Sequence, residues 1–181
     1  MNGHFKMFNQ MLKTINESLS IDLIKSYHYQ LKSGVFEDQL NGYPVGEFKN
    51  RVNRVSDIKT FKPKDVHDAL KKLLAEYKAS KHTLEDIAKF HARYEIIHPF
   101  QDGNGRTGRM IIVRQCFDAD LIPIIIQDSK KMFYYKALHL AQVEKNYEML
   151  IGFFKESQQD YLEEIHDFVE EFEETKSLDF F

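Results

Sequence analysis

Apolar residues recur at intervals of three and four positions through most of the chain, which is the period of an amphipathic helix. Ser20 and Thr83 precede two of these runs, and both are residue types that cap helix N-termini. Pro63 suits the first turn of another helix. The pattern predicts helices over residues 5–19, 20–31, 63–77, 83–97, 105–117, 128–141 and 147–172.

The helical period is lost between Gly34 and Lys62, where turn signals such as Asn41-Gly42 precede a segment rich in valine. We interpret this region as an ordered loop that carries a short β-hairpin within residues 45–55. The apolar stretch 121–126 is either a buried connector or a lone strand. The helical pattern predicts an all-α fold class, a helical bundle with a short hairpin. Because the sequence has no internal repeat, low-complexity linker or domain boundary, we expect a single domain.

Composition restricts the class of protein. A chain of 181 residues with 43% hydrophobic residues can bury a full core, and its net charge of -3 gives no general attraction for nucleic acid or an anionic membrane. Any anion site must therefore be local. Cys116 is the single cysteine, which fits a reducing compartment, and the longest apolar run is too short to span a membrane. We expect a cytoplasmic protein that binds neither nucleic acid nor membranes.

One stretch, residues 98–109, concentrates the chemistry of the chain. It reads His-Pro-Phe-Gln-Asp-Gly-Asn-Gly-Arg-Thr-Gly-Arg. The preceding helix should end near Ile97, because Pro99 disfavours helical geometry at His98 and should hold the His98 backbone extended. A new helix begins near Gly105. The stretch therefore forms a helix-loop-helix junction.

The first N–H groups of a helix lack helical partners and attract anions, so Gly103, Asn104 and Gly105 form a candidate phosphate cradle. The Asn104 side chain could donate a further hydrogen bond to phosphate. Arg106 and Arg109 are three residues apart and share a helical face, a spacing that suits a diphosphate or triphosphate.

A carboxylate directly before such a cradle would repel phosphate unless a cation lay between them. Asp102 is therefore a candidate Mg²⁺ ligand, since Mg²⁺ takes one or two carboxylates together with phosphate oxygens. A helix N-cap or a turn residue is its alternative role. His98 could act as a general base toward an attacking hydroxyl. Phe100 is expected to anchor the loop by burial.

The pattern His-x-Phe-x-Asp-Gly-Asn-Gly-Arg-x-x-Arg at His98 to Arg109 resembles the signature of the Fic family, with all eight specified positions filled. By motif order and spacing, the resemblance covers a core of about residues 20–155. A helix at 5–19 precedes that core, and a helical extension at 156–181 follows it. The resemblance implies a Fic-type helical bundle with a hairpin flap, all within one domain.

The resemblance also implies an activity, the transfer of AMP from ATP to a Ser, Thr or Tyr hydroxyl of a target protein with release of pyrophosphate. His98 would be the general base and Asp102 the Mg²⁺ ligand. The Gly103-Asn104-Gly105 segment would form the anion hole for the α- and β-phosphates, with Arg106 on the β-phosphate and Arg109 on the γ-phosphate. The residues alone leave open which phosphorus is attacked. Alternatives are transfer of another nucleotide or phosphate-containing group, removal of AMP, and a non-catalytic module that senses ATP.

Two other segments resemble functional parts of the family. The segment from Glu47 to Val55 resembles the flap, which would pair with the backbone of a target protein; a solvated basic loop is the alternative. Tyr134 and Tyr135 correspond to adenine-pocket positions, although helix core is the usual role of such residues. The predicted target-binding residues are Glu47, Phe48, Lys49, Asn50, Arg51 and Val52.

Many Fic proteins carry or receive an inhibitory helix with the pattern Ser/Thr-x-x-x-Glu-Gly/Asn, whose glutamate pairs with the arginine equivalent to Arg109. This chain offers only Ser33 to Glu37, which is followed by Asp38, and the shorter variant Thr175 to Asp179. Three hypotheses stay open: no inhibition in cis, a partner protein that supplies the glutamate, or a variant switch. Homo-oligomer formation also stays open.

Overall fold

The computed structural model describes residues 3–55 and 57–178, and it is predominantly helical. Single turns of 3₁₀ helix, Pro63–Asp65 and Asp128–Lys130, lead into α4 and α7. Strands β1 (Arg54–Val55) and β2 (Ile58–Lys59) pair antiparallel in a two-stranded sheet. The fold is therefore the expected helical bundle with a short hairpin. Its helices are α1 (Gly3–Lys13), α2 (Ile21–Lys32), α3 (Phe36–Asn41), α4 (Val66–Lys78), α5 (Leu84–Ile97), α6 (Asn104–Asp118), α7 (Lys131–Val143) and α8 (Glu148–Leu178).

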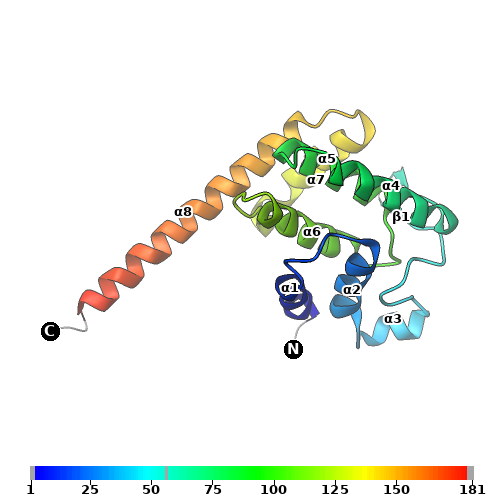
Figure 1. Cartoon of the computed structure of the whole chain (residues 1–181), viewed down its shortest axis with the longest axis horizontal. Helices are drawn as coiled ribbons and strands as arrows, with labels where there is room; N and C mark the ends of the chain where they lie inside the picture. Colours follow the sequence, from blue (N-terminus) through cyan, green and yellow to red (C-terminus); the bar gives the residue numbers. More distant parts are fainter. Residues whose placement is uncertain (1–2, 56, 179–181) are drawn as a thin grey trace.

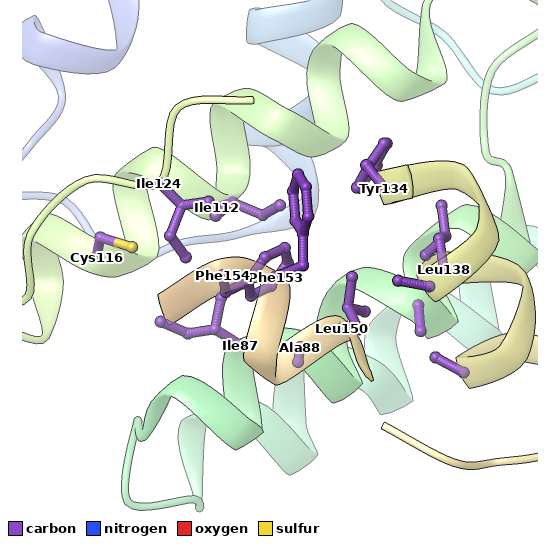
Figure 2. Close-up of a cluster of buried hydrophobic side chains, with 13 residues drawn as sticks. Ile87, Ala88, Ile112, Cys116, Ile124, Tyr134, Leu138, Leu150, Phe153 and Phe154 are labelled. Carbon is purple, nitrogen blue, oxygen red and sulfur yellow. The ribbon is translucent and has the colours of Figure 1, made fainter. Parts of the chain in front are cut away.

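Helix α5 is the element around which the others pack. It contacts α4, α6, α7 and α8, while α1 and α2 pack on each other and on α6 (Figure 1). Figure 2 shows one of the buried clusters, in which side chains of α5, α6, α7 and α8 meet around Phe153 and Phe154. The junction between α5 and α6 lies between these two groups of helices. Packing in the core therefore fixes the C-terminal end of α5 and the N-terminal end of α6.

Helix α8 has two parts with different surroundings. Near its start, Leu150, Phe153 and Phe154 are buried in the core. The rest projects from the body of the molecule, and side chains such as Ile165 and Phe168 are exposed (Figure 1). The helix continues to Leu178, beyond the predicted end near residue 172, and Asp179 of the Thr175 to Asp179 pattern lies outside the described residues. No helix in the described part of the chain is long and apolar enough to cross a membrane.

Helix ends and connections differ from the predictions at several places. Helix α1 ends at Lys13 instead of near residue 19. The hairpin strands are Arg54–Val55 and Ile58–Lys59, so the hairpin begins only where the expected segment 45–55 ends. Residues 121–126 form a connector without a strand, with Ile124 buried. Helix α3 was not predicted, because it has six residues and exposes its apolar Phe36 and Leu40. Ser33 follows the end of α2 and Glu37 lies on α3, so these two residues do not form one helical motif.

Candidate active site

Helix α5 ends where the sequence predicts, but the backbone at its end is not extended. His98 has φ 50° and ψ 64° in the left-handed region, and its N–H donates to the carbonyl of Tyr94 at 2.8 Å. This geometry terminates the helix and still avoids the right-handed conformation that Pro99 disfavours. A left-handed non-glycine residue costs on the order of 1 to 2 kcal/mol. The expectation of an extended backbone at His98 was therefore wrong, and the strain falls on the candidate base.

The loop after His98 is held from inside by Asn104. Its side-chain oxygen accepts from the Phe100 N–H at 2.8 Å, and its amide donates to the Phe100 carbonyl at 2.8 Å. Asn53 donates to the same carbonyl at 2.9 Å. Since Asn104 is buried, its side chain is committed to the loop and only its backbone can face a phosphate. The prediction that its amide donates to phosphate was therefore wrong, because that amide bonds Phe100.

Helix α2 supports the other side of the loop through His28. The imidazole stacks on Phe100, with 3.8 Å between ring centroids, and Phe100 is fully buried, as expected. The Nδ1 of His28 accepts from the Gly46 N–H at 2.9 Å, which leaves Nε2 protonated to donate to the Asp102 carbonyl at 3.0 Å. Burial lowers the pKa of His28 to about 4. A neutral imidazole therefore ties α2, the segment before the hairpin and the motif loop together.

Gly103 is the N-cap of α6, with φ 82°. A Cβ at this position would lie 3.2 Å from Leu31 and 3.4 Å from the Lys32 side chain, so a larger residue would be crowded by α2 and strained by the positive φ. The Gly103 carbonyl accepts from both the N–H and the hydroxyl of Thr107, each at 3.0 Å. The N-terminus of α6 thus begins as a fixed set of N–H groups, the geometry that binds anions.

Asp102 lies beside this helix end and carries two cationic partners. Its Oδ2 contacts Lys32 Nζ at 2.5 Å and Arg106 at 3.1 Å, and Lys32 also pairs with Asp38 at 2.8 Å. Burial alone would raise the pKa of Asp102, but bonds from Lys32 and the Gly103 N–H hold it below its usual value. Asp102 is therefore an ionised, half-exposed carboxylate next to the cradle.

That donor set is consistent with Mg²⁺ of the kind that nucleotides carry. No group of three or more His, Cys, Asp or Glu side chains in described residues could form an all-protein metal cage. Mg²⁺ commonly takes only one or two protein carboxylates and completes its octahedron with phosphate oxygens and water. Asp102 fits this role, because it lies where phosphate bound to α6 would be adjacent. It is not the helix N-cap, since Gly103 holds that position.

A cavity of about 410 Å³ opens beside the junction and brings several predicted residues together. Tyr134 is buried, its hydroxyl lies 2.6 Å from Nε2 of His91, and it also hydrogen-bonds Arg109. Tyr135 is half-exposed. The cavity can admit a nucleotide-sized ligand. Its lining consists of Val55, Ile58, Glu95, His98, Gly105, Arg109, Tyr134, Tyr135, Leu138, His139 and Gln142.

The segment predicted to bind a target divides into exposed and buried positions. Lys49 is buried, and its ammonium donates to Asn53, Thr60 and the Ile97 carbonyl at 2.8, 2.9 and 3.2 Å. Burial lowers its pKa to about 8. Lys49 therefore fastens the segment to the end of α5 and cannot reach a target. Phe48 is partly buried, and the exposed positions are Glu47, Asn50, Arg51 and Val52.

Glu95 is a site residue that the sequence reasoning missed. It is buried, it lines the cavity, and its carboxylate lies 3.6 Å from Nδ1 of His98. The available signal was its spacing, because residues three apart share a helical face.

Comparison with known proteins agrees with this geometry. The Fic/DOC family model matches residues 18–116, which is more than half of the chain. Protein adenylyltransferase Fic of Nematostella vectensis is 29% identical over 142 residues, covering 75% of this chain and 32% of that relative. Protein adenylyltransferase Fic of Drosophila willistoni is 39% identical over 69 residues, covering 38% and 14%. The chain thus spans about a third or less of these curated relatives.

Solved structures show the same fold at low identity. Fic-1 of C. elegans has a TM-score of 0.73 at 20% identity, covering 93% of this chain and 52% of that one. BepC of Bartonella tribocorum has a TM-score of 0.63 at 16% identity, covering 85% and 83%. Together with the complete motif at the α5–α6 junction and the family match, these results show that the chain belongs to the Fic/DOC family.

Proposed function

We propose that this chain is a protein adenylyltransferase that moves AMP from ATP to the hydroxyl of a Ser, Thr or Tyr side chain. The observation that carries the proposal is that His98, Gly105 and Arg109 line one cavity at the N-terminus of α6. The names of the curated relatives support it. So does the structurally similar BepC, which was solved with bound AMPPNP, an analogue of ATP.

The hydrogen bond at Nδ1 indicates which ring nitrogen of His98 carries the proton and which can act as a base. Nδ1 lies 3.2 Å from the carbonyl of Glu95, and a carbonyl can only accept, so Nδ1 carries the proton. Nε2 of the neutral ring then has a free lone pair and can accept the proton of an attacking hydroxyl. The hydroxyl oxygen bonds to the α-phosphorus, the bond from that phosphorus to the α,β-bridging oxygen breaks, and pyrophosphate leaves.

The phosphates would bind at the start of α6. Backbone N–H groups from Asn104 onward point out of the helix end, and Arg106 and Arg109 provide guanidinium groups on successive turns. Asp102 would hold Mg²⁺ beside them, and the bound ion would neutralise charge on the phosphate oxygens. The adenine and ribose would occupy the part of the cavity near Tyr135 and Leu138, where the half-exposed Tyr135 ring offers a stacking surface.

The hairpin would hold the target protein. Its two short strands carry Val55 and Ile58 on the cavity side, and an extended target segment could add to a strand edge by backbone hydrogen bonds. The exposed positions Glu47, Asn50, Arg51 and Val52 precede this hairpin in the chain and would add to the target-binding surface. An inhibitory partner that supplies a glutamate to Arg109 would enter the same cavity.

Radiolabelled ATP tests the proposal directly. Incubation with a cell lysate and Mg²⁺ should transfer label from the α-phosphate of ATP to protein, and none from the γ-phosphate. His98→Ala should lower this transfer about 10²- to 10⁴-fold, the usual contribution of a general base, while the thermal unfolding temperature stays close to that of the wild type.

Several outcomes would contradict the assignment. Label from the γ-phosphate would indicate phosphate transfer, and preference for another nucleoside triphosphate would indicate another nucleotidyl group. Binding of ATP without any labelled product, across many lysates, would indicate a sensing module. Equal labelling by His98→Ala would exclude His98 as the base.

A further inference from the structure

Glu95 lies one helical turn before His98 on α5 and faces α6. Only 5% of the residue is exposed, and a Cβ built on Gly108 would lie 2.4 Å from its Oε1. The carboxylate thus rests directly on the backbone of α6, and a methyl group at position 108 would push its oxygen aside. Because α5 and α6 pack against each other, the carboxylate lies between the two helices.

The Glu95 carboxylate can accept hydrogen bonds that the fold does not supply. Oε1 is buried and has no hydrogen-bond partner in the described part of the chain. A buried carboxyl oxygen without a hydrogen-bond partner is costly, so it persists where nearby positive charge or a function offsets the cost. Glu95 is also the single carboxylate among the residues that line the cavity. These features call for an explanation beyond packing.

We propose that Glu95 is a positioning residue for His98, whose carboxylate stabilises the imidazolium that forms when the base takes the hydroxyl proton. This inference rests on the proposed function. The Glu95 carbonyl accepts from Nδ1 at 3.2 Å and fixes the tautomer, while Oε2 lies 3.6 Å from the same nitrogen. One residue therefore orients the neutral ring through its backbone and opposes the positive charge through its side chain.

Other charged and titratable groups surround the same cavity. Burial lowers the pKa of His91 to about 4, so this neighbour stays neutral and does not compensate the carboxylate. Arg109 is the nearby permanent cation, but no ion pair joins it to Glu95 among the described residues. The charged and titratable groups that line the cavity are Glu95 and His98 from α5, Arg109 from α6, and Tyr134, Tyr135 and His139 from α7. Behind them, His91 bonds the Tyr134 hydroxyl, and Asp57 of the hairpin lies 3.2 Å from His139.

Glu95→Gln tests the proposal, because it removes the charge and keeps the shape. We expect kcat for AMP transfer to fall about tenfold, with the KM for ATP changed less than twofold. A neighbouring carboxylate stabilises an imidazolium, so its loss should move the acid limb of kcat/KM to lower pH. Glu85→Gln is the matched control, since Glu85 is exposed on the same helix and pairs with Lys89.

The opposite pattern would overturn the proposal. A raised KM for ATP with an unchanged kcat and an unchanged acid limb would show that Glu95 serves the nucleotide through Arg109. Gly108→Ala gives an independent check, because the added methyl group would displace the Glu95 carboxylate; it should lower kcat in a chain that still folds and binds ATP.

A readout without activity separates this inference from the proposed function. Histidine-selective NMR can follow the protonation of His98 in the wild type, in Glu95→Gln and in Glu85→Gln. The midpoint should move to lower pH only in Glu95→Gln, even if the chain transfers no AMP to any protein. An unchanged midpoint would refute the role of Glu95, whatever the labelling experiments show.

Discussion

The cavity has two walls that are built differently. The junction wall (Glu95, His98, Gly105 and Arg109) belongs to two packed helices. The hairpin wall (Val55 and Ile58) belongs to two strands of two residues each. A hairpin of this size has little stability of its own, so it depends on tethers such as the Asp57–His139 pair and the buried Lys49.

The two walls suit different tasks: the junction wall holds reacting groups in fixed positions, and the hairpin wall can adapt to a bound protein segment. Chemistry at the junction requires groups placed to a fraction of an ångström, and rigid elements achieve this. A surface that receives different protein segments benefits from backbone contacts on a lightly held edge. If the two walls differ in this way, substitutions in the junction wall should affect stability and rate together, while substitutions in the hairpin wall should affect substrate binding alone.

Asn104→Ala should give the largest effect. It leaves the Phe100 N–H buried without a partner, while the Phe100 carbonyl keeps only Asn53. We expect a loss of about 2 to 3 kcal/mol in the free energy of unfolding, measured with urea, and a fall in AMP transfer of about 100-fold. Asn41→Ala is the control, because this exposed amide bonds only the Glu37 carbonyl. Equal effects of the two substitutions would contradict a specially supported junction.

The pH dependence of the free energy of unfolding tests the burial of Lys49, which bonds residues on both sides of the hairpin. Burial lowers its pKa from 10.5 to about 8, so between these values the unfolded chain binds more protons and stability should rise with pH. The contribution between pH 8 and pH 10 is about 2 kcal/mol. Lys49→Met should remove this rise. If urea unfolding gives parallel pH dependences for the two proteins, the ammonium is not buried.

His139→Ala should give the smallest effect. It cuts the tether between α7 and the hairpin, a half-exposed hydrogen bond to Asp57 worth less than about 1 kcal/mol. We expect no measurable change in unfolding and a rise in the KM for a protein target of about two- to fivefold, with kcat unchanged. A loss of kcat comparable to that of Asn104→Ala would show that the hairpin wall is as rigid as the junction wall.

Most of the fold was predictable, because the helices have apolar stripes and clear ends. The capping box at Thr83 and the stop before Pro99 placed α5, and the glycines placed the start of α6. Helix α3 could not be found this way, since its buried residue is Asp38 and its apolar residues are exposed.

The roles predicted for the motif residues stay predictions, and the structure corrects the direction of two of the predicted side chains. His98, Gly105 and Arg109 do line one cavity. The inward turn of Asn104 and the burial of Lys49 depend on contacts with Phe100 and Ile97 that are made only in the folded chain. Residue type showed which atoms were available, and tertiary packing decided which of them were used.

The contact of Glu95 with Gly108 has a consequence for evolution of this fold. Any side chain at position 108 would take the space that the Glu95 carboxylate occupies. The two positions should therefore change together: a relative with a serine or alanine two residues after the first arginine of the motif, in place of Gly108, should lack a glutamate three residues before the histidine. Such a relative would need another way to balance the charge on its base, so this pair of positions divides chains with the same motif into two chemical groups.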